Sequence, residues 1–432
     1  MKLLKSNLYK TIRMNVIEKI AGMAAGFIRV PMLLGYLGTE KYGFIVLMLT
    51  ICNWLLFSDF GFGYSLKNSI SKYRAEENEK DILHLIRYCV TVLSLFCLIV
   101  LTICSIIIYK GVLLSFWGKY NFSPSEINLS AFIMLILYIP MIPLSIGRNI
   151  YYIYGKGETY SFFMALSQIL NILALYIAIQ LKAPIYMIIF WNYFFGVFIQ
   201  LVLLIAFAYF KFNTMNLFCS LFRKRKIHII NLGIKFFILQ IVSLVINQTD
   251  NIIIERFAGM SEISIYSVCI QLYNAGLVLV TVLSETLWTN YADHFNNKET
   301  EKLKHTFDMH KKISYIYGLA AVSGYIILAK PFIKLWTHGK IVPPTSLIVV
   351  IGLLFLFKIL NGPLVTFLNA LNILDKQILP SIINAILNLI LSIVFVKMIG
   401  ITGVALGTLI PFVVFSVGVD WYLCTNKKEI CT

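Results

Sequence analysis

Twelve long runs of apolar residues are the feature that most constrains how this chain can fold. They lie at about 14–37, 42–66, 88–109, 128–147, 160–181, 184–209, 233–256, 263–290, 312–333, 344–368, 378–397 and 402–424. Each is near the roughly 20 residues that a helix needs to cross about 30 Å of hydrocarbon. Lipid offers no water to open backbone groups, so each run is expected to be a helix. The pattern predicts an all-α polytopic membrane protein with about twelve transmembrane helices.

The composition excludes several other classes of protein. Hydrophobic residues make up 59% of the 432 residues and charged residues 13%, whereas a soluble domain averages about 45–50% and about 25%. An ordinary soluble enzyme, a disordered chain and a disulfide scaffold are therefore excluded. The sequence has no GxxxxGK[ST], GxSxG or HExxH motif, and its eight Cys and six His have no metal-ligand spacing. We expect no catalytic residues, no enzyme activity, no bound cofactor and no metal site.

The positive charge is distributed as in an inner-membrane protein. The net charge is +17, but no basic stretch is interleaved with aromatic residues on a soluble module, so nucleic acid is not an expected partner. With twelve spans and an inner amino terminus, about 24 of the 37 Lys and Arg residues fall in inner segments and about 9 in outer ones. This asymmetry follows the positive-inside rule and predicts that both termini are cytoplasmic.

A weak internal repeat divides the chain into two halves. Glu158 precedes Asn171 by 13 residues, and Asp375 precedes Asn388 by the same 13. A glycine followed by a tyrosine also opens each half, at Gly38 and at Gly259. We therefore predict a six-helix bundle over 1–209, a cytoplasmic linker over 210–232 and a second bundle over 233–432. Parallel repeats of this kind are typical of transporters with a central cavity.

The first apolar run carries small and polar residues on one helical face. Spacings of three and four residues align Asn15, Glu18, Gly22, Gly26 and Arg29. A charge near the centre of a membrane helix costs about 2.5–3.5 kcal/mol, so such side chains normally face protein or water. One interpretation is a cavity lining in which Arg29 contacts an anion. The alternative is a packing seam at Gly22 and Gly26, with Lys19 extending toward the interface.

The seventh run has a comparable polar face, formed by Gln240, Ser243, Asn247 and Asp250. The first repeat match has an offset of 217 residues and the glycine match one of 221; the offset of 221 makes Asp250 the equivalent of Arg29. We predict that the two face each other across the cavity, or pair when it closes outward, and that Asp250 takes part in coupling or gating. A purely structural ion pair is the alternative.

Other charges within the runs complete the candidate site. Asp59 lies at the same depth as Lys19, which predicts a pair near the inner mouth. Glu285 lies at a depth like that of Lys235 and is its candidate partner. Lys358 is near the midplane with no obvious acid at its depth, which makes it a candidate for binding an anion. The candidate substrate-binding residues are Arg29, Lys358, Lys235, Lys19 and Asn247, and those for coupling or gating are Asp250, Asp59 and Glu285.

Two segments carry a resemblance to a known family. PMLLGYLGTEKYGFIVLMLTICNWLLFSDFGFGYSLKNSISKY (31–73) resembles the opening of Wzx-type O-antigen flippases. LVTFLNALNILDKQILPSIINAILNLILSIVFVKMIGITGVALGTLI (364–410) resembles their last two spans. These flippases form the polysaccharide-transport branch of the multidrug/oligosaccharidyl-lipid/polysaccharide exporter superfamily. The resemblance in pattern covers almost the whole chain.

The resemblance implies a function as well as a fold. It implies twelve helices in two bundles, alternating access, and transfer of a polyprenyl-pyrophosphate-linked oligosaccharide repeat unit from the cytoplasmic to the periplasmic leaflet of a bacterial inner membrane. A cationic inner cavity would suit the pyrophosphate, because the fork of Arg29 matches its oxygens. Asp250 departs from a purely cationic lining and could couple transport to H⁺ or Na⁺. Besides the lipid-linked substrate and the bilayer, other polysaccharide-assembly membrane proteins are candidate partners.

Two other functions remain as alternatives. A multidrug/cation antiporter of the related multidrug branch would use acidic cavity residues to bind cations. A non-transporting scaffold or a polymerase is the other, although a polymerase would be expected to have a large outer loop. Four bases within the runs, against three acids and Glu18 at the edge, favour the flippase.

Overall fold

The protein is helical throughout the residues that its computed structural model describes. These are residues 2–56, 79–118, 122–212, 248–371 and 375–426, with a few single positions beside them. Within these ranges, ten helices are long and apolar enough to cross a membrane, and no strand occurs. The prediction of an all-α polytopic membrane protein is confirmed.

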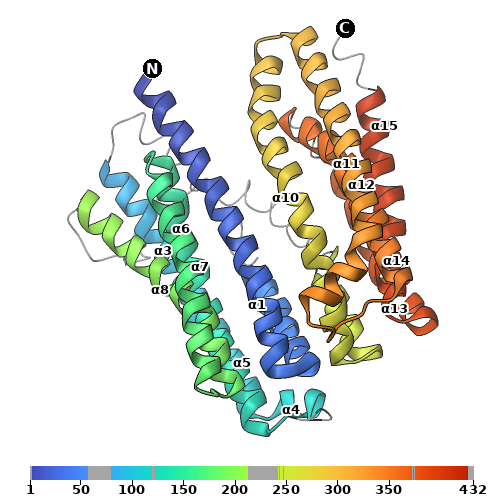
Figure 1. The fold of residues 1–432 in the computed structure, drawn as a ribbon. Helices are drawn as coiled ribbons and strands as arrows, with labels where there is room; N and C mark the ends of the chain where they lie inside the picture. Colours follow the sequence, from blue (N-terminus) through green and yellow to red (C-terminus); the bar gives the residue numbers. More distant parts are fainter. Residues whose placement is uncertain are drawn as a thin grey trace. The chain divides into compact units, whose positions relative to one another are not determined.

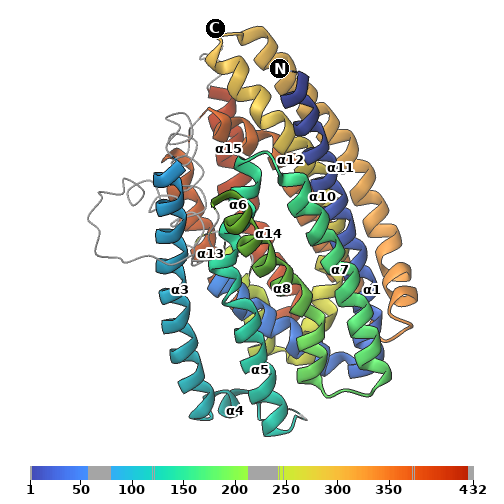
Figure 2. The ribbon, with the colours of Figure 1, turned by 90° about the vertical axis from the view of Figure 1, so that its left-hand side faces the viewer.

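The helices follow one another in two sets, coloured along the chain in Figure 1 and turned by 90° in Figure 2. The first set is α1 (Lys2–Leu56), α3 (Glu79–Tyr109), α4 (Val112–Trp117), α5 (Pro124–Tyr138), α6 (Met141–Ile153), α7 (Gly157–Gln180) and α8 (Ile185–Phe212). The second set begins with a helical segment over 248–257. It continues with α10 (Met260–Asn296), α11 (Thr300–Trp336), α12 (Thr345–Ala370), α13 (Asp375–Ile399), α14 (Ile401–Pro411), the π-helix η2 (Phe412–Val417) and α15 (Gly418–Asn426).

The number of helices agrees with the twelve apolar runs. The long helix α1 contains a non-helical residue, Gly38, at φ 78°, so the first run and the described part of the second lie on either side of a kink. A positive φ of this kind favours glycine, which has no Cβ. Gly259, the repeat equivalent of Gly38, also has a positive φ, of 102°. Of the seventh run, the structure describes the helical segment 248–257 and a few positions before it, and the described residues of the other runs are almost all helical.

The chain forms two compact units. The first comprises Met1–Met32 and Met48–Gln240, and the second comprises Leu33–Leu47 and Ile241–Thr432. The second unit thus includes the part of α1 around the kink. There, the Lys340 side chain donates to the carbonyls of Leu34 and Gly35, both at 2.9 Å. The predicted boundaries around the linker at 210–232 stay a prediction, because most of that segment lies outside the described residues.

In the first unit, α7 and α8 pack against each other with aromatic side chains along α8. Phe190 stacks on Phe194 with ring centroids 4.9 Å apart, and Phe194 stacks on Phe198 at 5.7 Å. The buried Asn171 of α7 accepts a hydrogen bond of 3.0 Å from the backbone N–H of Phe195. This bond links the fifth and sixth runs of the first half.

In the second unit, α13 and α14 take the corresponding place and pack through glycines. A Cβ at Gly403 would lie 2.2 Å from the carbonyl oxygen of Phe395, and one at Gly407 would lie 2.4 Å from the backbone nitrogen of Ser392. The two glycines form a GxxxG pattern, which lets helix backbones approach closely. The buried Asn388 of α13 donates to the Thr408 hydroxyl of α14 at 2.8 Å.

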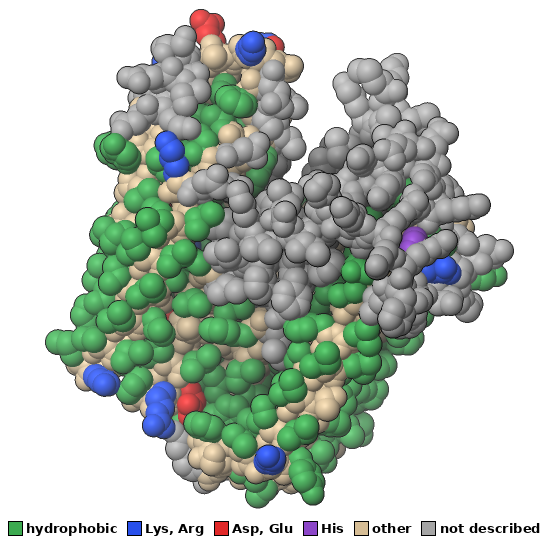
Figure 3. All heavy atoms as spheres, turned by 180° about the vertical axis from the view of Figure 1, so that it is seen from behind, with side chains coloured by type: hydrophobic (Ala, Val, Ile, Leu, Met, Phe, Trp, Pro, Cys, Tyr) green, Lys and Arg blue, Asp and Glu red, His purple; other side chains and the backbone are tan. Residues whose placement is uncertain are grey.

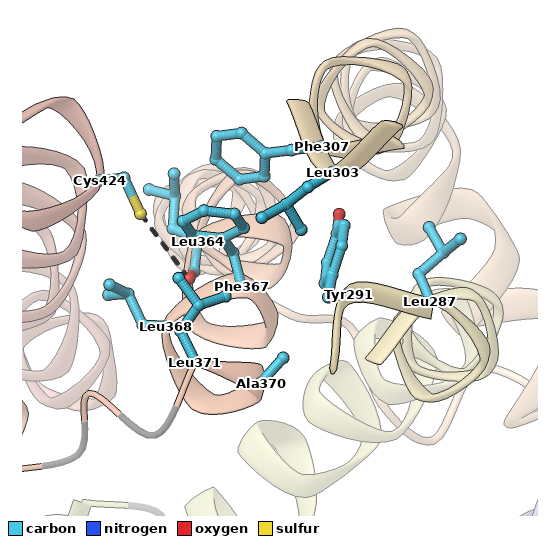
Figure 4. Close-up of a cluster of buried hydrophobic side chains, with 10 residues drawn as sticks. All are labelled: Leu287, Tyr291, Leu303, Phe307, Leu364, Phe367, Leu368, Ala370, Leu371 and Cys424. Atoms are coloured by element: carbon cyan, nitrogen blue, oxygen red, sulfur yellow. Dashed lines mark hydrogen bonds between the residues drawn. The ribbon is translucent and has the colours of Figure 1, made fainter. Parts of the chain in front are cut away.

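Buried apolar clusters lie within the units, while apolar side chains also cover much of the outside. Figure 4 shows one such cluster in the second unit, where rings from α10, α11 and α12 meet. Phe307 and Phe367 have ring centroids 4.5 Å apart, and Tyr291 packs edge-on to Phe367 at 5.8 Å. On the face drawn in Figure 3, hydrophobic side chains predominate over charged ones. This distribution suits a protein surrounded by lipid.

Candidate functional site: charged centres within the helical units

Arg29 is a charged group of the first unit that lies within a membrane-length helix. It is half-buried on α1, and its Nη2 donates to Oε1 of Gln168 on α7 at 2.7 Å. Its Nε is buried and has no hydrogen-bond partner. Gln168 is neutral, and no carboxylate of the described residues forms an ion pair with Arg29. The guanidinium therefore keeps both its charge and an open donor.

Two tyrosines lie close to this guanidinium. The phenol groups of Tyr138 on α5 and Tyr193 on α8 interact electrostatically with Arg29. Their rings meet edge to face with centroids 5.2 Å apart, and their phenol groups interact electrostatically with each other. On α8, the neighbouring Asn192 has a buried Oδ1 without a partner. We call Arg29, Gln168, Tyr138 and Tyr193 the Arg29 centre.

The polar face of the first run continues from Arg29 along α1. A Cβ added at Gly22 would meet no atom within 4 Å. The packing seam at Gly22 and Gly26 stays an alternative. Farther along, Asn15 and Glu18 each have a buried oxygen without a hydrogen-bond partner. Glu18 interacts electrostatically with Arg148 of α6, a contact that the sequence did not predict.

Asp250 is the corresponding charged group of the second unit, and it is enclosed by hydroxyls. Tyr266 of α10 donates to its Oδ2 at 2.5 Å. Thr408 of α14 lies 3.2 and 3.3 Å from its two carboxylate oxygens. Asn388 in turn donates to Thr408 and leaves its own Oδ1 buried without a partner. Asp250 itself is 7% exposed.

Lys358 of α12 belongs to the same centre. Its Nζ lies 5.7 Å from the ring centroid of Tyr273 and 5.8 Å from that of Phe412. It also interacts electrostatically with Asp250. The expectation that no acid lies near Lys358 is therefore wrong, since packing of α12 beside the segment 248–257 supplies one. We call Asp250, Tyr266, Thr408, Asn388 and Lys358 the Asp250 centre.

The remaining predicted site residues are described only in part. Asp59, Lys235 and Asn247 lie outside the described residues. Glu285 is on α10, but its side chain is outside the described part. Lys19 is half-buried on α1. The pairs Lys19–Asp59 and Lys235–Glu285 therefore stay predictions, as does the facing of Arg29 and Asp250, which belong to different units.

Sequence reasoning missed the polar partners of both centres. Gln168 and Thr408 are neutral residues within apolar runs, so no charge indicates them. The repeat matches Tyr266 with Tyr42 and Asn388 with Asn171, and each of the two asparagines bonds the following helix. Among the described residues, no group of three or more His, Cys, Asp or Glu side chains could hold a metal ion.

These features define a class of protein. Ten membrane-length helices among the described residues, arranged in two compact units, describe a multi-pass helical membrane protein. Residues 8–288 match the family described as polysaccharide biosynthesis protein. The chain belongs to this family.

Two curated relatives extend over most of the chain. A Yersinia pseudotuberculosis protein, named for a proposed role in O-antigen export, is 24% identical over 423 residues, which are 94% of this chain and 92% of that protein. A Salmonella typhimurium protein, named for a proposed role as an O-antigen transporter, is 23% identical over 399 residues, covering 88% and 87%. The predicted resemblance to O-antigen flippases is thereby confirmed.

Solved structures show the same fold. An inward-facing multidrug resistance MATE family transporter of the MOP superfamily has a TM-score of 0.73 at 14% identity, covering 96% of this chain and 98% of its own. The lipid II flippase MurJ, in an inward closed conformation, has a TM-score of 0.74 at 15% identity, covering 94% and 87%. At such identities the likeness establishes the architecture, which is that of the predicted superfamily.

Proposed function

We propose that this protein is a flippase that moves a polyprenyl-pyrophosphate-linked oligosaccharide repeat unit across a bacterial inner membrane. The head group would pass from the cytoplasmic to the periplasmic side by alternating access while the lipid tail stays in the bilayer. Membership of the polysaccharide biosynthesis family, relatives named for O-antigen export and a fold similar to a lipid II flippase support this assignment.

The observation that carries the proposal is the lack of an anionic partner for the Arg29 guanidinium among the described residues. An arginine within a membrane helix is energetically costly and usually marks a functional site. Here its one side-chain partner is a neutral amide, and its Nε has none. A pyrophosphate would supply the missing acceptor and the compensating charge, because guanidinium and phosphate oxygens form paired, charge-assisted hydrogen bonds. Lys358 provides a second cation in the other unit, held against two aromatic rings.

The test is export of surface glycan in a strain whose own copy of this gene has been deleted. Arg29→Ala and Lys358→Ala are expected to abolish surface glycan at a normal membrane level of the protein. Lys110→Ala is the matched control, since Lys110 is an exposed lysine at the end of α3. Full glycan from both site variants would overturn the assignment of the cationic groups.

Asp250 is proposed as the coupling group. Its carboxylate is enclosed by hydroxyls and faces a lysine charge, so gain or loss of a cation there would alter contacts of the segment 248–257, α10, α12 and α14 together. The ion is H⁺ or Na⁺. Flipping measured in proteoliposomes with an imposed pH gradient or an imposed Na⁺ gradient would identify it. Coupling through Asp250 would be refuted if Asp250→Asn responded to gradients as the wild type does.

The buried acid also supports a second function, cation/drug antiport. The deletion strain with and without the protein distinguishes the flippase from the antiporter. An antiporter would expel a cationic dye such as ethidium and would not be needed for surface glycan. We expect glycan to depend on the protein and dye efflux not to. Dye efflux that requires Asp250, with normal glycan in the deletion strain, would favour the antiporter.

Alternating access predicts a change in the distance between the two centres. Cysteines placed at positions 29 and 250 of a chain with its native cysteines replaced should cross-link in one conformational state and not in another. Cysteines at 110 and 250 serve as a control, since position 110 is outside the Arg29 centre. If the 29/250 pair cross-links in no state, with or without substrate, the two residues do not face each other.

A further inference from the structure

A groove between α6, α7 and α8 lies apart from both charged centres. It belongs entirely to the first unit and has a volume of about 880 Å³. Its size is within the roughly 300–1,000 Å³ of sites that hold small molecules. No feature of the proposed transport path uses it, and it begins where α6 ends and α7 starts.

The groove has a charged end and an apolar body. Lys156, Glu158 and Lys211 line the end, and the two lysines are exposed. Phe163 of α7 with Phe198 and Phe210 of α8 line the body and are themselves exposed. An occupant must therefore combine an anionic head with a long apolar chain.

The walls of the groove are held in place by packing. Tyr151 donates to the carbonyl of Leu203 at 3.1 Å, and its ring lies 5.2 Å from that of Phe207. Tyr154 also packs on Phe207, at 5.2 Å, and carries the Lys211 ammonium 5.5 Å from its ring centroid. The exposed Lys211 side chain is thus held with its ammonium over an aromatic ring at the charged end of the groove.

We propose that this groove binds an anionic phospholipid of the surrounding bilayer. The phosphate would lie between Lys156 and Lys211, and an acyl chain would lie along the exposed phenylalanines. Basic pockets between membrane helices bind anionic head groups in this way, and each nearby lysine adds about fivefold in affinity. Glu158 opposes an anion at the same end, so it moderates the affinity. The positive-inside pattern places this end at the cytoplasmic leaflet.

The experiment is native mass spectrometry of the purified full-length protein titrated with phosphatidylglycerol. Phosphatidylcholine with the same acyl chains is the neutral comparison, and inorganic phosphate is added as a competitor. We expect phosphatidylglycerol to bind more tightly than phosphatidylcholine and to resist millimolar phosphate. Equal binding of the two lipids, or displacement by phosphate alone, would overturn the proposal.

Variants locate the binding within the protein. Lys156→Gln with Lys211→Gln should weaken phosphatidylglycerol binding by roughly 25-fold. Glu158→Gln should strengthen it, and this opposite change cannot come from damage to the fold. Lys110→Gln, on an exposed lysine of the same unit, should leave binding unchanged. Unchanged binding in both groove variants refutes the site.

One further titration separates the phospholipid from the transported lipid. Polyprenyl phosphate is expected to bind this groove more weakly than phosphatidylglycerol, and Arg29→Ala is expected to leave phosphatidylglycerol binding unchanged. Tighter binding of polyprenyl phosphate, lost on changing the two lysines, would make the groove a substrate site and refute the phospholipid. Because Arg29 is outside the groove, failure of the flippase proposal would not affect this result.

Discussion

The predicted repeat makes Arg29 and Asp250 equivalent, yet their surroundings differ. Arg29 has one neutral hydrogen-bond partner and an open Nε, whereas Asp250 is held by Tyr266 and Thr408 and faces the charge of Lys358. A charged group with open donors is suited to bind a ligand from outside. A charged group whose partners come from several helices is suited to change the packing of those helices when its charge changes. We therefore propose that the predicted repeat gives one position two tasks, ligand binding at Arg29 and coupling at Asp250.

The largest expected effect is on the rate of flipping and tests whether Arg29 binds the substrate. Arg29→Ala should reduce the rate of flipping in proteoliposomes by roughly 10- to 150-fold, because a hydrogen bond to a charged group contributes about 1.5–3 kcal/mol. Gln168→Ala should cost only a few-fold, since the guanidinium and its charge remain. Arg29→Lys should fall between them, because lysine keeps the charge without the fork. If Gln168→Ala were as damaging as Arg29→Ala, Arg29 would have a structural task instead.

The next largest effect tests whether Asp250 couples flipping to the driving gradient. Asp250→Asn should lower the rate of flipping about tenfold and remove its dependence on the driving gradient, while substrate binding by the detergent-solubilised protein stays within about threefold. The measurement is flipping with and without the gradient, beside equilibrium binding of the lipid-linked substrate. Loss of binding that matches the loss of rate would mean that Asp250 holds substrate and that the division of tasks is wrong.

The halves also differ where their fifth and sixth runs meet, and a matched glycine pair tests this. Gly407→Ala should destabilise the protein by about 1–3 kcal/mol, because its Cβ would lie 2.4 Å from a backbone nitrogen of α13. Gly196→Ala on α8 should be neutral or stabilising, because its Cβ would lie 3.8 Å from Asn171 Nδ2 and alanine favours helices. Thermal unfolding in detergent gives both values. Equal shifts in melting temperature would contradict the difference in packing.

The smallest effect comes from a polar contact between α10 and α11, for which the first unit has no described counterpart. Glu299 accepts from Lys302 at 2.8 Å and pairs with His294 at 2.7 Å, which lowers the pKa of the Glu299 carboxyl. A lowered pKa in the folded state stabilises the fold above the ordinary value near 4.5 and loses this contribution as the pH falls through the folded pKa.

The measurement is thermal unfolding of the wild type and Glu299→Gln at pH 7 and at about pH 3. The variant should melt slightly below the wild type at pH 7 and alongside it at the lower pH. Glu301→Gln, two residues along and exposed, is the control and should show no difference at either pH. A wild-type advantage that grew on acidification would have the wrong sign for this contact.

The sequence determined the helices and their number, because hydrocarbon cannot hydrogen-bond the backbone and only an apolar run of sufficient length can cross it. It also located Arg29 and Asp250, since charges within such runs are rare, and it matched the two through the repeat. The positive φ of Gly38 and Gly259 agrees with that match. Periodicity placed Arg29 on a polar face but gave no distance to any other helix.

Only the tertiary structure decided which neighbours these charges have. Gln168 is 139 residues from Arg29, and Thr408 is 158 residues from Asp250, so their contacts depend on how helices pack. In lipid, that packing depends on small residues and neutral polar side chains, which are inconspicuous in an apolar sequence. For the same reason Lys358 was expected to lack an acid, although the packing of α12 brings Asp250 to it. Hydropathy fixes what enters the membrane, and side-chain packing fixes what each helix meets there.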